Sequence, residues 1–151
     1  MKNGKLPIVS EIKIIYRNKV KKQNRNKIQK SEDVYLNIKH VFSELVEYRE
    51  SFVIVLLNRA NEILGYSKIS EGGTNGTVVD LKIIFQVALK ANASSIILCH
   101  NHPSGNLNPS NSDIEMTKKI SQAGEIMDIK VLDHIIISSE SYYSFADNQI
   151  I

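Results

Sequence analysis

Two histidines separated by one residue follow a short apolar segment of the chain. Residues 95–99 (Ser-Ile-Ile-Leu-Cys) are typical of a buried β-strand, and His100 and His102 come directly after them. Side chains two residues apart on an extended chain point to the same side, so both imidazoles can reach one point while Asn101 faces away. A His-x-His pair that stands alone is weak evidence for a metal site, but the geometry of the pair suits a metal ion.

A carboxylate further along the chain is the candidate for a third ligand. Residues 103–105 (Pro-Ser-Gly) turn the chain, and residues 109–112 have the composition of a helix start, which places Asp113 in or near the first helical turn. Two imidazole nitrogens and one carboxylate oxygen form a zinc site with a fourth position left for water, as in catalytic zinc sites. Alternatively, Ser110 and Asp113 form only a capping box.

The spacing of four residues resembles the JAMM motif of JAB/MPN metalloproteases: His100, His102, Ser110 and Asp113. The surrounding text, His-Asn-His-Pro-Ser-Gly, resembles the RadC branch, whose members have long been labelled DNA-repair proteins. The resemblance covers roughly residues 31–147. It implies that His100, His102 and Asp113 bind Zn²⁺ and that Ser110 helps to hold the reacting carbonyl oxygen. It also implies an α/β fold of the JAB/MPN type, which is cytidine-deaminase-like.

A zinc hydrolase also needs a carboxylate that takes a proton from the metal-bound water and passes it to the leaving amine. In the family this glutamate lies far upstream, at the start of a strand, and Glu50 has that place before the apolar residues 53–57. Glu71, which precedes two glycines, is the alternative base, and Glu50 can also be interpreted as a solvated helix end. The resemblance then implies a metallopeptidase that cleaves an amide or isopeptide bond in a peptide or protein substrate.

Other functions must be weighed against this hypothesis. One alternative is a non-catalytic binding module of DNA repair or recombination on the same fold. Another is a metal-dependent nuclease, suggested by the letters His-Asn-His, although the HNH nuclease motif disperses those residues over a ββα unit. A zinc deaminase is excluded, because its signature needs Pro-Cys-x-x-Cys and Cys99 is the chain's single cysteine. We expect Cys99 to be a small buried side chain.

A third histidine, His134, lies on a predicted strand and is a further candidate ligand. Since the family supplies two histidines, we interpret His134 as a buried histidine whose hydrogen bonds are satisfied or which supports a ligand.

The apolar periodicity predicts helices at residues 31–48, 80–91 and 110–124, with Gly124 ending the last one. It predicts strands at residues 50–57, 62–70, 95–99, 129–137 and 142–145. The first two strands are joined by a turn-rich tetrapeptide and form a hairpin, in which the second strand lies nearer an edge. The glycine-rich residues 71–77 form a connector or a substrate-facing loop. This alternation predicts a single domain with a central mixed β-sheet flanked by helices on both faces.

The length of 151 residues fits one domain. We expect residues 31–151 to form it, and residues 1–30 to form a short strand or extended arm (8–16) followed by a basic linker. No apolar run approaches the roughly 20 residues of a membrane span, and the first residues lack the apolar region of a signal peptide. We therefore expect a cytoplasmic protein that does not bind a membrane.

The linker at residues 17–30 carries seven Lys and Arg residues and no acidic residue, although the whole chain has a net charge of +3. Such a run can contact phosphates through sequence-independent, salt-dependent interactions. The candidate nucleic-acid contacts are Lys19, Lys21, Lys22, Arg25 and Lys27. Without aromatic residues for base stacking, we expect weak DNA binding or a solvated linker. Full-length RadC proteins carry a helix-hairpin-helix region ahead of the domain, and the arm of about thirty residues here puts that route to DNA in doubt.

Overall fold

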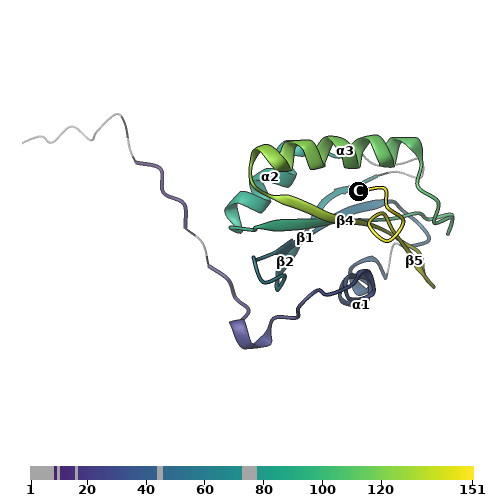
Figure 1. Ribbon diagram of the computed structural model, residues 1–151, viewed down its shortest axis with the longest axis horizontal. Helices are drawn as coiled ribbons and strands as arrows, with labels where there is room; N and C mark the ends of the chain where they lie inside the picture. The colour runs from purple at the N-terminus through teal and green to yellow at the C-terminus, as the bar shows by residue number, and fades with distance from the viewer. Residues whose placement is uncertain (1–8, 10, 16, 44–45, 73–77) are drawn as a thin grey trace, which may run out of the picture.

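The computed structural model describes residues 9, 11–15, 17–43, 46–72 and 78–151. Figure 1 shows a sheet with helices on both of its faces. After a short 3₁₀ helix, η1 (Lys22–Asn24), the elements are α1 (Ser31–Phe42), β1 (Ser51–Leu57), β2 (Ile63–Glu71), α2 (Leu81–Lys90), β3 (Ser95–Asn101), α3 (Asn111–Ile126), β4 (Lys130–Ile137) and β5 (Tyr142–Ser144).

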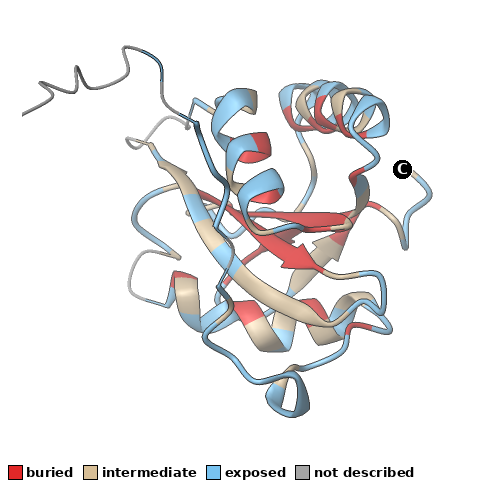
Figure 2. Ribbon diagram, turned by 90° about the vertical axis from the view of Figure 1, so that its left-hand side faces the viewer, coloured by how far each residue is buried: buried red, intermediate tan, exposed pale blue. Residues whose placement is uncertain are grey.

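The five strands form one mixed sheet in the order β2-β1-β3-β4-β5. β1 is antiparallel to both β2 and β3, β3 is parallel to β4, and β4 is antiparallel to β5. The predicted hairpin and mixed sheet are confirmed, and β2 is an edge strand as expected. All seven residues of β1 and of β3 are buried, because both strands lie inside the sheet and are covered on both faces (Figure 2).

The two faces of the sheet bury separate apolar clusters. α1 covers one face with Val34, Ile38 and Phe42, which pack against alternate residues of β1, β3 and β4. α2 and α3 cover the other face, where Phe85 and Ile120 are buried. The α/β fold class expected from the sequence is therefore correct. No helix in the described part of the chain is long and apolar enough to cross a membrane.

Two helices end where the sequence did not predict. α1 ends at Phe42, short of residue 48, and α3 continues past Gly124 to Ile126. A Cβ added at Gly124 would lie 2.3 Å from the carbonyl oxygen of Ile129. Gly124 is therefore required for the close approach of the following chain, and the helix ends before Asp128, which has a left-handed backbone (φ 55°).

Part of the predicted linker at residues 17–30 packs against the domain. The N–H of Ile63 donates to the carbonyl of Asn26 at 2.8 Å, and the N–H of Ile28 donates to that of Asn61 at 2.9 Å. Ile28 is buried against the cluster beneath α1. Residues 26–28 thus pair beside the start of β2, whereas the described residues 11–15 contain no strand, are exposed and reach away from the sheet (Figure 1).

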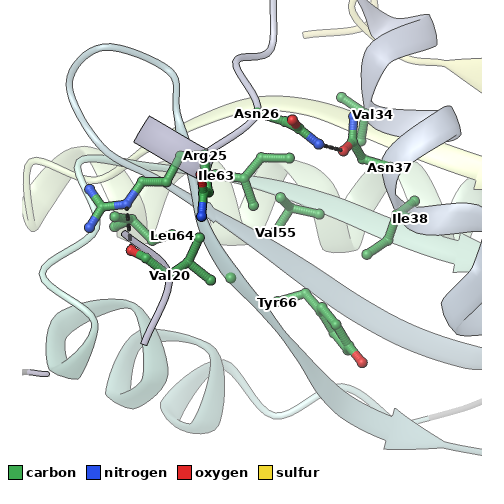
Figure 3. Close-up of a pocket in the computed structure, with 12 residues that line it drawn as sticks. Val20, Arg25, Asn26, Val34, Asn37, Ile38, Val55, Ile63, Leu64 and Tyr66 are labelled. Carbon is green, nitrogen blue, oxygen red and sulfur yellow. Dashed lines mark hydrogen bonds between the residues drawn. The ribbon is translucent and has the colours of Figure 1, made fainter. Parts of the chain in front are cut away.

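A cavity of about 180 Å³ lies where the arm crosses α1 and β2 (Figure 3). The side chain of Asn26 donates to that of Asn37 at 2.6 Å across one wall, and Arg25 Nε donates to the carbonyl of Val20 at 3.3 Å on another. Val55 of β1 lines the cavity on the α1 face of the sheet. None of the predicted metal ligands lines it.

Candidate metal centre

Three side chains converge at the carboxyl end of β3. His100 lies within β3, His102 directly follows the strand, and Asp113 lies in the first turn of α3. The two Nε2 atoms are 2.9 Å apart, and each lies 3.4 Å from a different carboxylate oxygen of Asp113. These are the three ligands predicted from the sequence, and one candidate ligand atom from each lies within 4.8 Å of the others.

The capping box at the start of α3 holds the carboxylate of Asp113 in place. Ser110 is the N-cap residue, and its N–H and hydroxyl both donate to Asp113 Oδ2 at 2.7 Å. The N–H of Asp113 donates back to Ser110 Oγ at 3.1 Å. The capping box predicted for Ser110 and Asp113 is thus confirmed. This box is compatible with metal binding, because it orients the carboxylate of Asp113 toward both histidines. Contact of Ser110 with a reacting carbonyl stays a prediction.

The charges around the cluster suit a divalent cation. Burial lowers the pKa of His100 to about 4, so this ring is neutral at neutral pH. Burial alone would raise the pKa of Asp113, but hydrogen bonds from His102 and Ser110 and the proximity of His100 hold it well below its usual range. The hydrogen bond with Asp113 raises the pKa of His102. The cluster therefore has an ionised carboxylate beside a neutral imidazole, and metal binding requires His102 to lose its proton as well.

The separations of the donor atoms also fit one ion. Two ligand atoms about 2.0–2.2 Å from a tetrahedral zinc lie about 3.3 Å from each other. The Nε2 and carboxylate separations of 2.9 and 3.4 Å are close to that value. The Nδ1 of His102 lies against the carbonyl of Asn106, which can only accept a hydrogen bond. In the neutral ring, the Nε2 of His102 is therefore free to bind a metal.

Of the two candidate bases, Glu50 lies beside this cluster. It directly precedes β1 and is half-buried. Burial raises its pKa, and the carboxyl also interacts electrostatically with His102, which lowers the pKa, and with Asp113, which raises it. Glu71 instead forms an exposed ion pair with Lys68, and this contact lowers its pKa. The structure therefore brings Glu50, and not Glu71, into electrostatic contact with the predicted ligands.

His134 lies behind His100 and is separate from the three-residue cluster. Its Nε2 is 2.7 Å from the Nδ1 of His100, and its own Nδ1 is 2.6 Å from the hydroxyl of Thr117. All three side chains are completely buried, and burial lowers the pKa of His134 well below its usual range. The supporting position expected for His134 is thus present in the structure.

Sequence reasoning missed Thr117 and left the partners of Asn101 open. Thr117 lies four residues after Asp113 on the same face of α3, a spacing that could have identified it. Asn101 faces away from the histidines, as expected, and hydrogen-bonds to the first residue of β1 and to the segment before it. Cys99 is completely buried as predicted, and burial raises the pKa of its thiol.

The candidate nucleic-acid contacts lie at the opposite end of the sheet. The arm pairs beside Ile63, which is aligned with Leu57 at the end of β1. His100, in contrast, is aligned with Phe52 near the beginning of β1. The side chains of four of the five predicted contacts are exposed: Lys19, Lys21, Lys22 and Lys27. Arg25 is partly buried. The structure therefore does not bring the basic arm together with the metal cluster.

Comparison with known proteins agrees with this geometry. The family model described as the RadC-like JAB domain matches residues 28–150. A UPF0758 protein of Flavobacterium johnsoniae is 45% identical over 124 residues, which are 82% of this chain and 53% of that protein. Another, from Alkaliphilus metalliredigens, is 40% identical over 129 residues, which are 84% of this chain and 54% of that protein. The chain therefore spans about half the length of the curated relatives it matches.

Proposed function

Because this chain belongs to the family of RadC-like JAB domains, we propose that it is a zinc-dependent hydrolase of the JAMM type. We propose further that it cleaves an amide or isopeptide bond in a peptide or protein. One observation carries the proposal: His100, His102 and Asp113 converge beside the half-buried carboxyl group of Glu50. A set of metal ligands with an adjacent carboxylate is the minimum that metal-assisted hydrolysis requires.

The roles of the side chains follow from their positions. Zinc bound by His100, His102 and Asp113 would supply a Lewis acid that acidifies water and polarises a carbonyl. Glu50 accepts a proton from the attacking water and delivers it to the departing nitrogen. The raised pKa of Glu50 suits both steps, because its carboxyl group holds a proton more readily than an exposed glutamate does. Ser110 orients Asp113 through its N–H and its hydroxyl, and we propose that this hydroxyl also contacts the reacting carbonyl oxygen of the substrate.

Access to the cluster is from the side of His102. The side chain of His100 is completely buried, whereas that of His102 is 16% exposed. A hollow of about 330 Å³ opens beside His102 and is lined by Glu47, Ser104 and Ser138, among others. Its polar lining suits an extended peptide with polar side chains better than an apolar ligand. The scissile bond would then approach the cluster across His102.

Metal content and hydrolysis together test this proposal. We expect about one zinc per chain in the wild-type protein by elemental mass spectrometry, loss of zinc in His102→Ala and retention of zinc in Glu50→Gln. The zinc-loaded proteins are then incubated with a mixture of linear and lysine-branched peptides, and new amino groups are counted by mass spectrometry. Glu71→Gln is the matched control for the base. Equal hydrolysis by wild type and Glu50→Gln, or a wild-type protein that binds no zinc, would contradict the proposal.

A non-catalytic binding role in DNA repair or recombination is the second candidate function. The observation that favours it is the exposed lysine side chains of the arm, which lie far from the cluster and are free to contact phosphates. In that case the domain binds metal without turnover, and Glu50→Gln leaves its function intact.

A further inference from the structure

A chain of hydrogen bonds behind His100 runs from α3 through β4 to β3. The hydroxyl of Thr117 donates to the carbonyl oxygen of Asp113, one turn earlier in α3, at 2.6 Å. A hydroxyl has a single proton and a carbonyl oxygen can only accept. The proton of Thr117 is therefore used in this bond, and its oxygen must accept any other hydrogen bond that it makes.

The direction of the next two bonds follows from the first. His134 Nδ1 lies 2.6 Å from Thr117 Oγ1, so this nitrogen carries a proton and donates it. His134 is neutral in its buried position, which leaves its Nε2 without a proton. That Nε2 lies 2.7 Å from His100 Nδ1 and therefore accepts a hydrogen bond from it. His100 thus carries its proton on Nδ1, and its Nε2 offers a lone pair toward His102 and Asp113.

We infer that Thr117 and His134 are positioning residues that hold His100 in the tautomer needed to bind a metal. This inference rests on the proposed zinc site. Zinc-binding histidines are commonly held by a partner on their second nitrogen, and that partner is usually a carboxylate, a carbonyl or water. Here the partner is a second imidazole, whose own tautomer is fixed by a threonine on the helix that carries the carboxylate ligand. The tautomer of one ligand is thereby coupled to the helix that supplies another.

The side chains around His100 and His134 limit the hydrogen bonds that these two imidazoles can make. The ring of Phe52 stacks on that of His100 with a centroid distance of 6.1 Å, and the ring of Phe145 stacks on that of His134 at 4.6 Å. Both phenylalanines are completely buried. These aromatic rings offer no acceptor that competes for the protons on His134 and on His100 Nδ1, so the direction of the chain of hydrogen bonds depends on the hydroxyl of Thr117.

Substitutions of Thr117 test this dependence. Thr117→Val keeps the shape of the side chain and removes the hydroxyl, so His134 loses its acceptor and can move its proton to Nε2, which forces His100 into the other tautomer. Thr117→Ser keeps the hydroxyl. We expect zinc affinity, measured by competition with a chromophoric chelator, to fall by about 10- to 100-fold in Thr117→Val. We expect it to stay near the wild-type value in Thr117→Ser.

Nitrogen-15 NMR of the histidine rings in zinc-free protein is the second readout, since long-range proton–nitrogen correlations distinguish the two tautomers. We expect His100 to carry its proton on Nδ1 in the wild type and in Thr117→Ser, and on Nε2 in Thr117→Val. A wild-type His100 with its proton on Nε2 would overturn the inference, even if Thr117→Val does not fold. Folded Thr117→Val with wild-type zinc affinity would do the same. A wild type that binds no zinc would instead contradict the proposed function, while the NMR result still decides the tautomer.

Discussion

The side chain of Asn101 accepts a hydrogen bond from the backbone N–H of Ser51 at 2.8 Å, between β3 and the start of β1. Its amide group also donates to the carbonyl oxygens of Arg49, at 2.7 Å, and Val46, at 3.0 Å. The residue between the two histidines thus holds the backbone on both sides of Glu50. One strand end presents two candidate metal ligands on one face and fixes the segment of the candidate base on the other.

We predict that Asn101→Asp lowers hydrolysis and leaves zinc binding intact. The carboxylate keeps the size of the side chain and accepts from Ser51, but it cannot donate to the two carbonyls and repels both of them. We expect turnover to fall by about 10- to 100-fold, because small displacements of a catalytic group have costs of this size. Zinc content, measured by elemental mass spectrometry, should stay at the wild-type value. Wild-type turnover in Asn101→Asp would show that the contact does not position Glu50.

A second prediction concerns the close approach at Gly124. Its Cα lies against the carbonyl of Ile129, whose N–H in turn donates to the carbonyl of Gly124 at 2.9 Å. Gly124→Ala gains about 1 kcal/mol of helix propensity but forces the backbone of Ile129 to move, and overpacking costs about 1–3 kcal/mol or more. We expect a net loss of stability in urea unfolding. Gln122→Ala, an exposed change in the same helix, is the control, and stabilisation by Gly124→Ala would contradict the prediction.

The stability of the zinc-free protein should fall as the pH is lowered from 7 to 5. Burial lowers the pKa of His100 from 6.5 to about 4 in the folded state. Between these values the unfolded chain binds more protons, so stability is full above about pH 6.5 and is lost as the pH falls toward 4. At about 1.4 kcal/mol per pKa unit, the loss from His100 alone at pH 5 is about 2 kcal/mol. The pKa of His134 is shifted in the same direction.

Urea unfolding at the two pH values measures this loss. The raised pKa values of His102, Glu50 and Asp133 act in the opposite direction. We expect the two completely buried imidazoles to outweigh them, because His102 is only half-buried and carboxyl groups ordinarily titrate below pH 5. His40→Gln, which removes an exposed histidine outside the cluster, is the control for the loss of one imidazole. Equal or greater stability at pH 5 would show that the buried rings are not held neutral.

Much of the fold could be predicted because its signals are local. The apolar residues of β1 and β3 with turn residues beside them indicate buried strands, and the geometry of a strand brings His100 and His102 together. The position of Asp113 follows from the helix start at Ser110. Residues 73–77 of the loop predicted at residues 71–77 lie outside the described residues.

The features that sequence reasoning missed depend on contacts between distant segments. Gly124 has the local signature of a helix end. It lies inside α3 instead, because the carbonyl of Ile129, beyond the end of the helix, packs against it. Residues 26–28 have little apolar character, yet one buried isoleucine and two backbone hydrogen bonds suffice to pair them beside β2. The contact of His134 with His100 depends on the parallel register of β3 and β4, in which His134 is aligned with Leu98.

The basic arm gives the last prediction, which tests DNA as a partner. We propose that the exposed Lys19, Lys21, Lys22 and Lys27 contact phosphates weakly and without sequence preference. Binding of duplex DNA, followed by fluorescence anisotropy, should weaken when all four are replaced by Gln. The slope of log affinity against log salt should decrease in magnitude by about 0.9 for each phosphate that the arm no longer neutralises.

A control variant separates the arm from the overall charge of the protein. It replaces four exposed lysines on α2 and α3 by Gln, and so makes the same change in net charge: Lys82, Lys90, Lys118 and Lys119. We expect this variant to keep most of the affinity and the salt slope of the wild type, because its lysines lie outside the arm. Equal weakening in the two variants would mean that net charge alone attracts DNA. Unchanged binding in the arm variant would exclude the arm as the contact surface.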